Sequence, residues 1–320
     1  LAMAARWCKR MAMLDGGRKV DDGPSRQLLR EPRSDVGQRL VASARAREGG
    51  RSPKRPDRET VLQVEEMRCW HAIGGMPWAP VWLKAVEGVS FNLRAGETLG
   101  VVGASGCGKS TLCRALMGLN SIRGGRVDLL GQDLLKLRGE KLRSARRALQ
   151  MVFQDPLACL NPALPVVDAI ADPLLIHGIA TKASAREQAR GLLERVGLIP
   201  VEQFQHRLPR QLSGGQQQRV AIARALALEP KVVICDESVS MLDAEVQAEV
   251  LSLLRDLQHQ LGLAMIFVTH DLSVASGFCH RVIVLDKGRI VEEGPGDRLF
   301  EAPQAPISRL LVEACPRLPR

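Results

Sequence analysis

The chain has 320 residues, of which 45% are hydrophobic and 25% charged, a composition typical of globular proteins and unlike disordered, collagen-like or multi-span membrane chains. The formal charge of +10 is concentrated in residues 1–60, which carry 15 Lys and Arg against 8 Asp and Glu, so the nearly neutral remainder does not favour a nucleic-acid-binding surface. The eight Cys contain no C-x-x-C pair and lie mostly in apolar runs, which favours reduced, buried thiols over disulfides or a zinc site. No apolar run reaches the roughly 18 residues of a membrane span, and the N-terminus does not match a signal peptide, so any membrane contact is expected to be peripheral.

The N-terminal segment resembles the C-terminal end of the same chain. Aligned without gaps at an offset of 271, residues 1–45 and 272–316 share 15 identical positions, and LDGGRKVDDGP (14–24) matches LDKGRIVEEGP (285–295). We therefore expect residues 1–45 to be the C-terminal remnant of a preceding copy of the domain. The polar stretch at 46–60 is rich in Arg, Gly and Pro and predicts a linker, which leaves a main domain at 61–316 and a short tail at 317–320.

The main domain alternates strand-like and helix-like patterns. Residues 61–70 and 84–93 predict strands of a small sheet, and the later alternation predicts parallel β units joined by helices, hence an α/β fold. Four apolar runs end at residues able to bind a ligand, namely Gly100–Val102, Leu149–Phe153, Val232–Cys235 and Ile266–Thr269. Because ligands of open parallel sheets bind beyond the carboxyl ends of the strands, these four ends predict one shared site.

A glycine-rich loop follows the first of these runs. GASGCGKS fits G-x-x-x-x-G-K-[ST] between a predicted strand and a predicted helix at Lys109–Met117. Its members are Gly103, Ala104, Ser105, Gly106, Cys107, Gly108, Lys109 and Ser110. Glycines let backbone N–H groups surround a phosphate chain, Lys109 adds a positive charge, and the Ser110 hydroxyl can ligate Mg2+. The alternative is a glycine-rich turn that only starts a helix.

Acidic and polar residues follow the other three runs. Asp236 and Glu237 are adjacent at a strand end and point to opposite faces, so one can serve a metal and the other an attacking water. The alternative for two such acids is a helix cap. Gln154 and His270 each end a strand, where a histidine is otherwise a structural residue.

A second helix N-terminus carries an unusual pair of glycines. Leu212 to Gln216 (LSGGQ) precedes a predicted helix at Gln217–Leu228, and Ser213 with Gln216 has the spacing of a capping box. Glycines in a first turn each cost about 1 kcal/mol relative to Ala, which indicates a close backbone approach such as a second phosphate-binding site. The alternative is a flexible cap.

Taken together, these motifs resemble the ATP-binding cassette (ABC) ATPases. GASGCGKS, Gln154, LSGGQ, VVICDE, Asp243 in SVSMLD and His270 occur in that family's order across about residues 61–316. FQDPLACLNP (153–162) and EEGPGDRLFEAP (292–303) resemble more narrowly the ATPase subunits of oligopeptide, dipeptide, nickel and glutathione importers, some of which carry two ATPase domains on one chain. The resemblance implies a P-loop NTPase core with a parallel sheet, an antiparallel β subdomain and a helical subdomain at about 155–211.

The resemblance also implies roles for single residues. The loop from Gly103 to Ser110, with Thr111, would hold the triphosphate of ATP; Ser110, Gln154 and Asp236 would serve Mg2+. Glu237 would be the general base and His270 would contact the γ-phosphate. Ser213, Gly214, Gly215 and Gln216 would close over a nucleotide held by an opposing ATPase domain, with Asp243 at the dimer seam.

Some positions depart from the family pattern. The aromatic residue that stacks on adenine is commonly Tyr, and the chain has none, so Trp70 is the nearest candidate by position, against a packing role for the same residue. Trp78 and Trp82 lie in the same segment. Met241 stands where the seam motif commonly has a small residue, and Cys107 occupies a variable loop position.

These expectations describe an ATP-hydrolysing, energy-coupling subunit of an importer for peptides or similar small solutes. It would lie peripherally at the cytoplasmic face of the cell membrane, with permease subunits, a second ABC ATPase domain and an extracytoplasmic solute-binding protein as partners, and no nucleic acid. The alternative is a soluble tandem ABC protein acting on ribosomes or nucleic acid, which the duplication and basic N-terminus favour. A third hypothesis is a nucleotide-dependent regulatory module without turnover.

Overall fold

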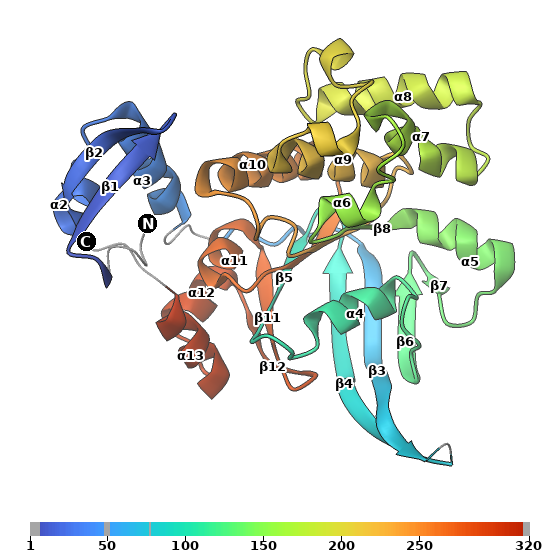
Figure 1. Cartoon of the computed structure of the whole chain (residues 1–320). Helices are drawn as coiled ribbons and strands as arrows, with labels where there is room; N and C mark the ends of the chain where they lie inside the picture. Colours follow the sequence, from blue (N-terminus) through green and yellow to red (C-terminus); the bar gives the residue numbers. More distant parts are fainter. Residues whose placement is uncertain (1–6, 48–51, 77, 316–320) are drawn as a thin grey trace.

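A computed structural model of the chain describes residues 7–47, 52–76 and 78–315 (Figure 1). The predicted tail at 317–320 lies outside the described residues, as do the parts of the predicted remnant and linker that fall at 1–6 and 48–51. Within the described residues, no helix combines the length and the apolar character needed to cross a membrane.

A six-stranded sheet forms the centre of the main domain. Its order is β12-β11-β5-β10-β9-β8, and every neighbouring pair is parallel except the antiparallel pair β11–β12. The strands are β5 (Thr98–Val102), β8 (Leu149–Val152), β9 (Val232–Asp236), β10 (Ala264–Val268), β11 (Arg281–Asp286) and β12 (Arg289–Gly294). The apolar runs of the sequence form the inner strands because both faces of a parallel sheet are covered.

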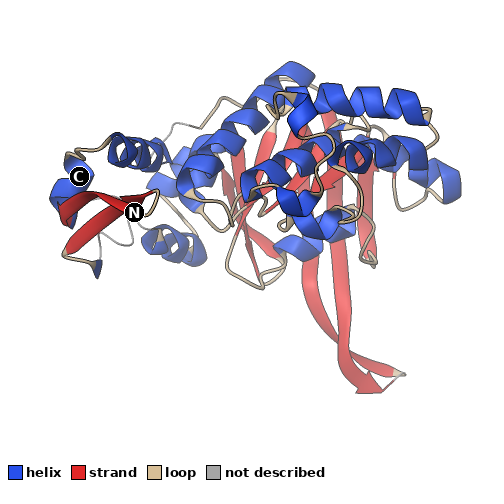
Figure 2. Cartoon of the chain, turned by 45° about the horizontal axis from the view of Figure 1, so that its top comes forward, coloured by secondary structure: helices blue, strands red, loops and turns tan. Residues whose placement is uncertain are grey.

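The antiparallel sheet beside it has the order β4-β3-β6-β7. Its strands are β3 (Thr60–Met76), β4 (Ala79–Arg94), β6 (Gly124–Leu129) and β7 (Gln132–Asp133). The β3–β4 hairpin is longer than predicted, because pairing continues through Gly75 and Pro80 to Met76 and Ala79. Figures 1 and 2 show its tip extending well away from the rest of the molecule.

One face of the central sheet is covered by helices, and the other by α4 (Lys109–Leu116) together with the antiparallel sheet. The other helices of the main domain are α5 (Gly139–Ala145), α6 (Pro156–Cys159), α7 (Val166–Ile176), α8 (Lys182–Arg195), α9 (Gly214–Leu226), α10 (Ala244–Leu261), α11 (Leu272–Phe278), α12 (Gly296–Glu301) and α13 (Pro306–Ala314). Three 3-10 turns accompany them at Arg146–Ala148, Val201–Gln203 and Pro209–Gln211. Alternate residues of one strand enter different cores: Met265 and Phe267 pack with the helical side, and Ile266 and Val268 pack toward α4 and the antiparallel sheet. The α/β class, with parallel, antiparallel and helical parts, is confirmed.

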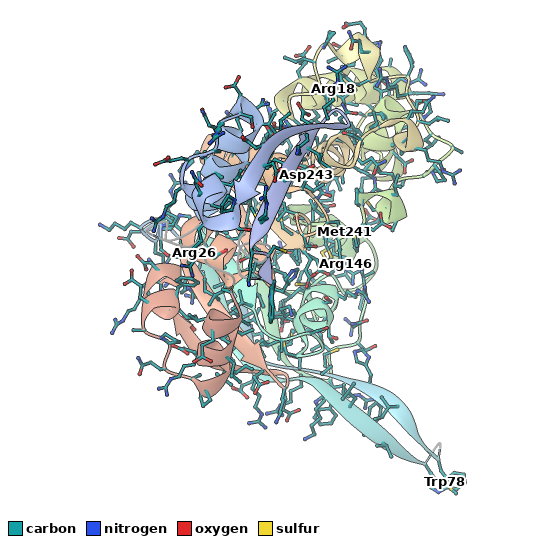
Figure 3. All side chains as sticks on the ribbon, turned by 60° about the vertical axis from the view of Figure 1, so that its left-hand side comes forward. Arg18, Arg26, Trp78, Arg146, Met241 and Asp243 are labelled. Atoms are coloured by element: carbon teal, nitrogen blue, oxygen red, sulfur yellow. The ribbon has the colours of Figure 1, made fainter. Side chains whose placement is uncertain are left out.

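The N-terminal unit has the same element order as the end of the chain. It contains β1 (Arg10–Asp15), β2 (Arg18–Pro24), α2 (Ser25–Arg30) and α3 (Asp35–Arg47). Shifted by 271, β1 and α2 coincide residue for residue with β11 and α12, and both hairpins change register at the same aligned step. The unit packs through α3 on α10 and α11, with Arg39 Nη1 3.8 Å from Glu245 Oε1, and Figure 3 shows it on the same side as Asp243.

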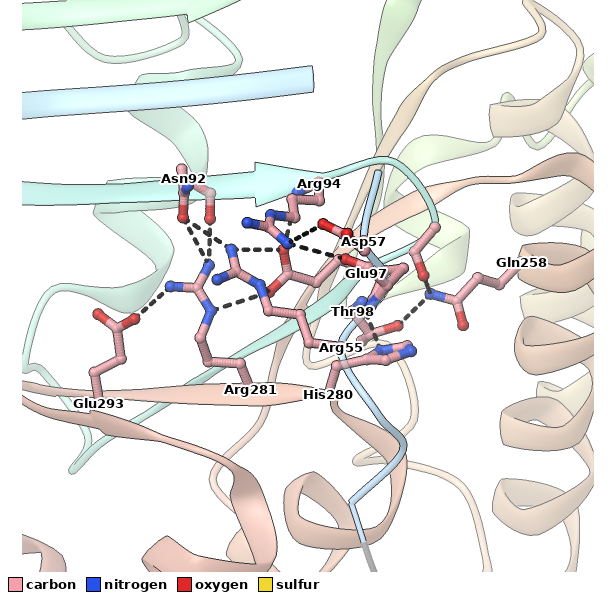
Figure 4. Close-up of polar contacts among 12 residues, drawn as sticks. Arg55, Asp57, Asn92, Arg94, Glu97, Thr98, Gln258, His280, Arg281 and Glu293 are labelled. Atoms are coloured by element: carbon pink, nitrogen blue, oxygen red, sulfur yellow. Dashed lines mark hydrogen bonds and ion pairs between the residues drawn. The ribbon is translucent and has the colours of Figure 1, made fainter. Parts of the chain in front are cut away.

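The described part of the predicted linker lies against the main domain. Ser52 Oγ donates a hydrogen bond to the Ser276 carbonyl at 2.8 Å, and Arg55 Nε lies 2.8 Å from the buried Glu97 carboxylate. Figure 4 shows Arg55 and Arg281 approaching Glu97 together, beside Asn92. Ser52 and Arg55 of the predicted linker therefore contact the main domain, at α11 and at the residue just before β5.

Candidate functional site

A cavity of about 680 Å3 opens where the carboxyl ends of β5, β8 and β9 meet the β3–β4 hairpin. Its lining comprises His71, Leu83, Lys84, Ala85, Ser105, Gly106, Cys107, Gly108, Lys109, Ser110, Thr111, Gln154, Glu237, Lys287 and Gly288. Three of the four predicted strand ends contribute residues to this cavity, whereas His270, at the fourth, is not among the lining residues. The glycine-rich loop at residues 103–110, hereafter the P-loop, supplies one wall, while Gln154 and Glu237 reach the cavity from the ends of separate strands.

The P-loop needs its glycines because other backbone lies against it. Gly103, Gly106 and Gly108 have φ values of 156°, 77° and 113°. A Cβ on Gly103 would lie 2.3 Å from the Leu285 carbonyl oxygen, and one on Gly108 would lie 2.1 Å from that of Ala85. Any side chain at these two positions would therefore displace the loop from β4 and β11.

Lys109 is buried at the first turn of α4. Its Nζ donates to the carbonyl oxygens of Gly103 at 2.8 Å and Ala104 at 3.1 Å, so the ammonium group is held inside the loop. Cys107 Sγ lies 3.9 Å from this Nζ, and burial, the largest cause, raises the pKa of the Cys107 thiol. The loop thus presents a fixed positive charge and the N-terminus of α4 to an anion.

Two side-chain oxygens that could ligate a metal, those of Ser110 and Asp236, lie close together at the end of the P-loop. Ser110 Oγ donates to Asp236 Oδ1 at 3.4 Å, across the gap between α4 and the end of β9. Burial raises the pKa of Asp236, and the neighbouring charge of Glu237 raises it further. A buried carboxylate with this environment is stabilised by an added cation, and hydroxyl and carboxylate oxygens suit Mg2+.

Glu237 and His270 lie together at the ends of β9 and β10. His270 Nδ1 is 3.4 Å from Glu237 Oε2, and the Glu237 amide donates to the Val268 carbonyl at 3.1 Å. Glu237 has φ = 46°, a left-handed conformation that costs about 1–3 kcal/mol in a non-glycine residue. Glu237 forms part of the cavity lining in this strained conformation.

Trp70, for which the sequence left open a role in stacking on adenine or in packing, makes its polar contacts within the β3–β4 hairpin. Its Nε1 donates to Glu87 Oε2 at 2.6 Å, and Lys84 Nζ lies 4.9 Å from its ring centroid. Among the described residues, the cavity lining contains His71 and omits Trp70. The two residues are neighbours on β3, and the register of the hairpin turns His71 toward the cavity beside Leu83.

Sequence reasoning missed several lining residues besides His71. Lys84 and Ala85 come from β4, while Lys287 and Gly288 form the turn between β11 and β12. The Gly288 amide donates to the Cys107 carbonyl at 2.9 Å, which joins this turn to the P-loop. The sequence does contain one indication of this turn: the aligned N-terminal segment repeats it as Gly16-Gly17.

The LSGGQ residues lie outside the cavity lining of their own chain, at the N-terminus of α9. Ser213 Oγ accepts from the Gln216 amide at 3.4 Å, and Gln216 Oε1 accepts from the Ser213 amide at 3.0 Å, so the predicted capping box is present. The helix begins at Gly214, three residues before the predicted start. A Cβ on Gly215 would lie 2.4 Å from Val246 Cγ1, which is the close approach that requires glycine there.

Asp243 caps the helix that Gly215 packs on. Its Oδ1 accepts from the amides of Glu245 at 3.2 Å and Val246 at 3.0 Å, which fixes the first turn of α10. Met241, just before it, is exposed (Figure 3). The first turns of α9 and α10 therefore pack on each other, and their residues do not belong to the cavity lining.

Comparisons with known proteins agree with this geometry. A family model described as "ABC transporter" matches residues 86–240. The chain is 44% identical over 264 residues to the oligopeptide transport ATP-binding protein OppF of Escherichia coli, covering 81% of this chain and 78% of OppF. It is 48% identical over 232 residues to the glutathione import ATP-binding protein GsiA of Pectobacterium atrosepticum, covering 72% of this chain and 37% of GsiA.

A solved structure shares the fold. The ATP-binding cassette MJ0796, in a dimeric post-hydrolysis state bound to ADP and Pi, superposes with a TM-score of 0.65 at 31% sequence identity. The match covers 73% of this chain and 98% of that chain.

Proposed function

Because the chain belongs to the ABC transporter family and is an ATP-binding cassette ATPase, we propose that it hydrolyses ATP to drive import of peptides or similar small solutes. The observation that carries the catalytic part is the single cavity that joins Lys109, Gln154 and Glu237. The substrate class is supported by the names of relatives, which include oligopeptide and glutathione import proteins.

The phosphates of ATP would lie along the P-loop. Backbone amides from Gly106 to Thr111 and the Lys109 ammonium would bind them, while Ser110, Asp236 and Gln154 would hold Mg2+. Bound Mg2+ would neutralise charge on the phosphates during phosphoryl transfer. The raised pKa of Asp236 supports this assignment, because it indicates that the neighbouring residues do not supply enough positive charge to offset the burial of the carboxylate.

Glu237 would act on the attacking water. Its carboxylate would accept the water proton as the water oxygen bonds to the γ-phosphorus and the bond to ADP breaks. His270, 3.4 Å from Glu237, would orient that carboxylate and contact the γ-phosphate.

The adenine base would lie between His71 and Leu83, at the hairpin side of the cavity. An imidazole ring offers a flat face for stacking, and stacking of a base on an aromatic ring contributes about 1–3 kcal/mol. We therefore assign the base contact to His71 and a packing role to Trp70, which is hydrogen-bonded to Glu87.

The surface of Ser213 to Gln216 would close on a nucleotide held by an opposing ATPase domain, with Asp243 and Met241 at the seam. Its exposure at a helix N-terminus suits an anion supplied from outside. Permease subunits and an extracytoplasmic solute-binding protein would complete the importer, with this chain at the cytoplasmic face of the membrane.

The N-terminal unit would belong to a second cassette. Its strands and helices repeat β11 to α13 at an offset of 271, including the register change in the hairpin. This supports assignment of residues 1–45 as the C-terminal end of a preceding ABC ATPase domain.

Replacement of Glu237 by Gln tests the catalytic assignment. E237Q should bind ATP as well as the unaltered chain and lose phosphate release by about 10^2 to 10^4-fold, because the general base is gone. E202Q, at an exposed glutamate of the helical subdomain, is the matched control and should hydrolyse ATP normally. Turnover by E237Q at the normal rate would refute the assigned base.

Two neighbouring substitutions test the base contact. H71A should weaken ATP binding about 5- to 100-fold, from the loss of a stacking contact, whereas W70A should leave affinity within about twofold. Titration with a fluorescent ATP analogue measures both. A larger effect of W70A would return the base contact to Trp70.

The importer assignment requires membrane partners. The tagged chain purified from its native membranes should carry its permease subunits, and the complex should show ATPase activity stimulated by peptide. Recovery with ribosomes or RNA instead would favour the tandem soluble alternative.

A further inference from the structure

The two copies of the β-β-α-α unit bury one face of their hairpins alike. In the C-terminal copy, Val282 and Val284 of β11 pack with Leu299 of α12 and Val312 of α13. In the N-terminal copy, the aligned face of β1 packs with Leu28 of α2 and Val41 of α3, and includes buried Met13. Each unit therefore covers this face with its own helices.

The opposite face differs between the copies. In β11, Ile283 and Leu285 are fully buried in the core shared with β5 and α4, and a Cβ on Gly108 would lie 3.4 Å from Leu285 Cδ2. In β1, the aligned residues Ala12 and Leu14 are exposed, and Leu14 is 68% exposed where Leu285 is 0% exposed. Leu14 therefore lacks a cover equivalent to the P-loop, which covers the aligned Leu285 in the main domain.

The charged residue at the start of each hairpin shows the same contrast. Arg281 is 10% exposed and lies 3.0 Å from the buried Glu97 carboxylate just before β5, as well as against Glu293 of β12 (Figure 4). The aligned Arg10 keeps the cross-strand pair, with Nη2 3.4 Å from Asp22 Oδ1, yet its side chain is 72% exposed. Arg10 therefore keeps the ion pair within its hairpin and remains exposed where Arg281 contacts the Glu97 carboxylate.

We propose that the face formed by Arg10, Ala12 and Leu14 is a docking surface for the core of a preceding cassette domain, whose P-loop strand would pair with β1 as β5 pairs with β11. The inference rests on the assignment of the N-terminal unit to a second cassette. The occupant must have a P-loop strand with an unpaired edge for β1. It must also have apolar side chains beneath its P-loop to cover Leu14, and a carboxylate to pair with Arg10.

A second copy of this chain does not meet these conditions. In the sheet order β12-β11-β5-β10-β9-β8, β5 already has β11 on one edge and β10 on the other. The position of Glu97 opposite an incoming arginine is likewise taken by Arg281 and Arg55. The occupant is therefore a cassette core that has no other C-terminal hairpin, which points to a segment that precedes residue 1 on the same natural polypeptide.

The placement of the unit adds a consequence for the dimer. α3 holds the unit against α10 and α11, and Arg39 pairs with Glu245, two residues after Asp243. A core docked on β1 would consequently lie beside the start of α10, on the side of the molecule assigned to the opposing ATPase domain. The unit would tie the two cassettes of one polypeptide together at their seam.

Hydrogen–deuterium exchange on two proteins tests the proposal: this chain, and the product of the complete natural reading frame. In the longer protein, amides of residues 10–15 should exchange at least tenfold more slowly than in this chain, because a strand covers the open edge. L14K should abolish that protection and lower the Tm of the longer protein, while leaving the Tm of this chain unchanged. V20K is the matched control, since Val20 and its counterpart Val291 are both exposed in the structure.

Each other outcome overturns the inference. A reading frame that encodes no second P-loop ahead of residue 1 removes both the occupant and the assignment of a preceding cassette. A second P-loop without slower exchange at residues 10–15, or with L14K and V20K equivalent, leaves that assignment standing and removes the docking surface. ATP turnover by this chain and its loss in E237Q report on the proposed catalytic function separately.

Discussion

Replacement of Arg281 by Met should destabilise the main domain, and the equivalent replacement of Arg10 should not. Arg281 joins β11 to Glu97, Asn92 and Glu293, and the Glu97 side chain it contacts is fully buried. Methionine keeps the apolar stem and removes the guanidinium. The substitution therefore isolates the polar contribution of the cluster in Figure 4.

The magnitude follows from what remains around Glu97. Removal of one partner of a buried ion pair costs about 3–5 kcal/mol when the other charge is left uncompensated. Here Glu97 keeps Arg55 Nε at 2.8 Å and the Arg94 amide at 2.9 Å, so we expect about 3 kcal/mol. For a domain of this size each kcal/mol shifts the Tm by about 2–4 °C, which gives a decrease of about 6–12 °C. Arg10 and Asp22 form an exposed pair, and R10M should change stability by about 0–1 kcal/mol.

Thermal unfolding followed by circular dichroism measures both variants under the same buffer and protein concentration. The double variant R281M/E97Q should recover part of the loss, because it removes the uncompensated carboxylate together with its partner. A Tm decrease of less than about 2 °C in R281M, or an equal decrease in R10M, would refute the argument that burial of Glu97 makes this arginine important.

Three further substitutions probe the site. K109A should weaken ATP binding about 10- to 100-fold, measured by titration calorimetry, because the phosphates lose a charged hydrogen-bond donor. D236N should raise the Tm of the nucleotide-free chain at pH 7 and abolish ATP turnover. The direction of this Tm change follows from the pKa of Asp236, which burial raises above 3.8 in the folded state. Because the folded state binds the proton more tightly than the unfolded state, the stability of the unaltered chain falls as pH rises from about 4 through the folded pKa. The Tm difference between D236N and the unaltered chain should therefore shrink as pH falls toward 4. G215A should lower the Tm, because overpacking against Val246 costs about 1–3 kcal/mol and outweighs a helix-propensity gain of about 1 kcal/mol. The double variant G215A/V246A should recover the lost stability. Equal Tm values for G215A and the unaltered chain would contradict the close approach of Gly215 to Val246.

The parts of the site that the sequence predicted are those fixed by local pattern. The P-loop, the acids at the end of β9 and the capping box of α9 each depend on residues within about ten positions of one another, and each lies at the strand end or helix start that its motif predicts. The parallel arrangement of the strands then brings Gln154 and Glu237 to the same cavity, since both follow strand ends.

The base contact could not be predicted in the same way. Whether Trp70 or His71 faces the cavity depends on the register of the β3–β4 hairpin, which shifts at several steps, including Met67 to Arg68 and Cys69 to His71. One such shift turns every following side chain to the other face of the sheet. Position relative to the first strand therefore indicates the candidate segment and leaves undetermined which of its residues faces the cavity.

Leu14 and Leu285 show where the limit of sequence prediction lies. Both follow the same hairpin register change, both precede Asp and a Gly-containing turn, and their local backbone elements coincide, yet one is exposed and the other fully buried. The internal repeat predicts the element and its covered face, because these depend on contacts within about 35 residues. The burial of the other face depends on β5 and the P-loop, which lie about 180 residues away in the main domain. The exposure of Leu14, at a position that is core in the other copy, is therefore the observation on which the proposed docking surface depends.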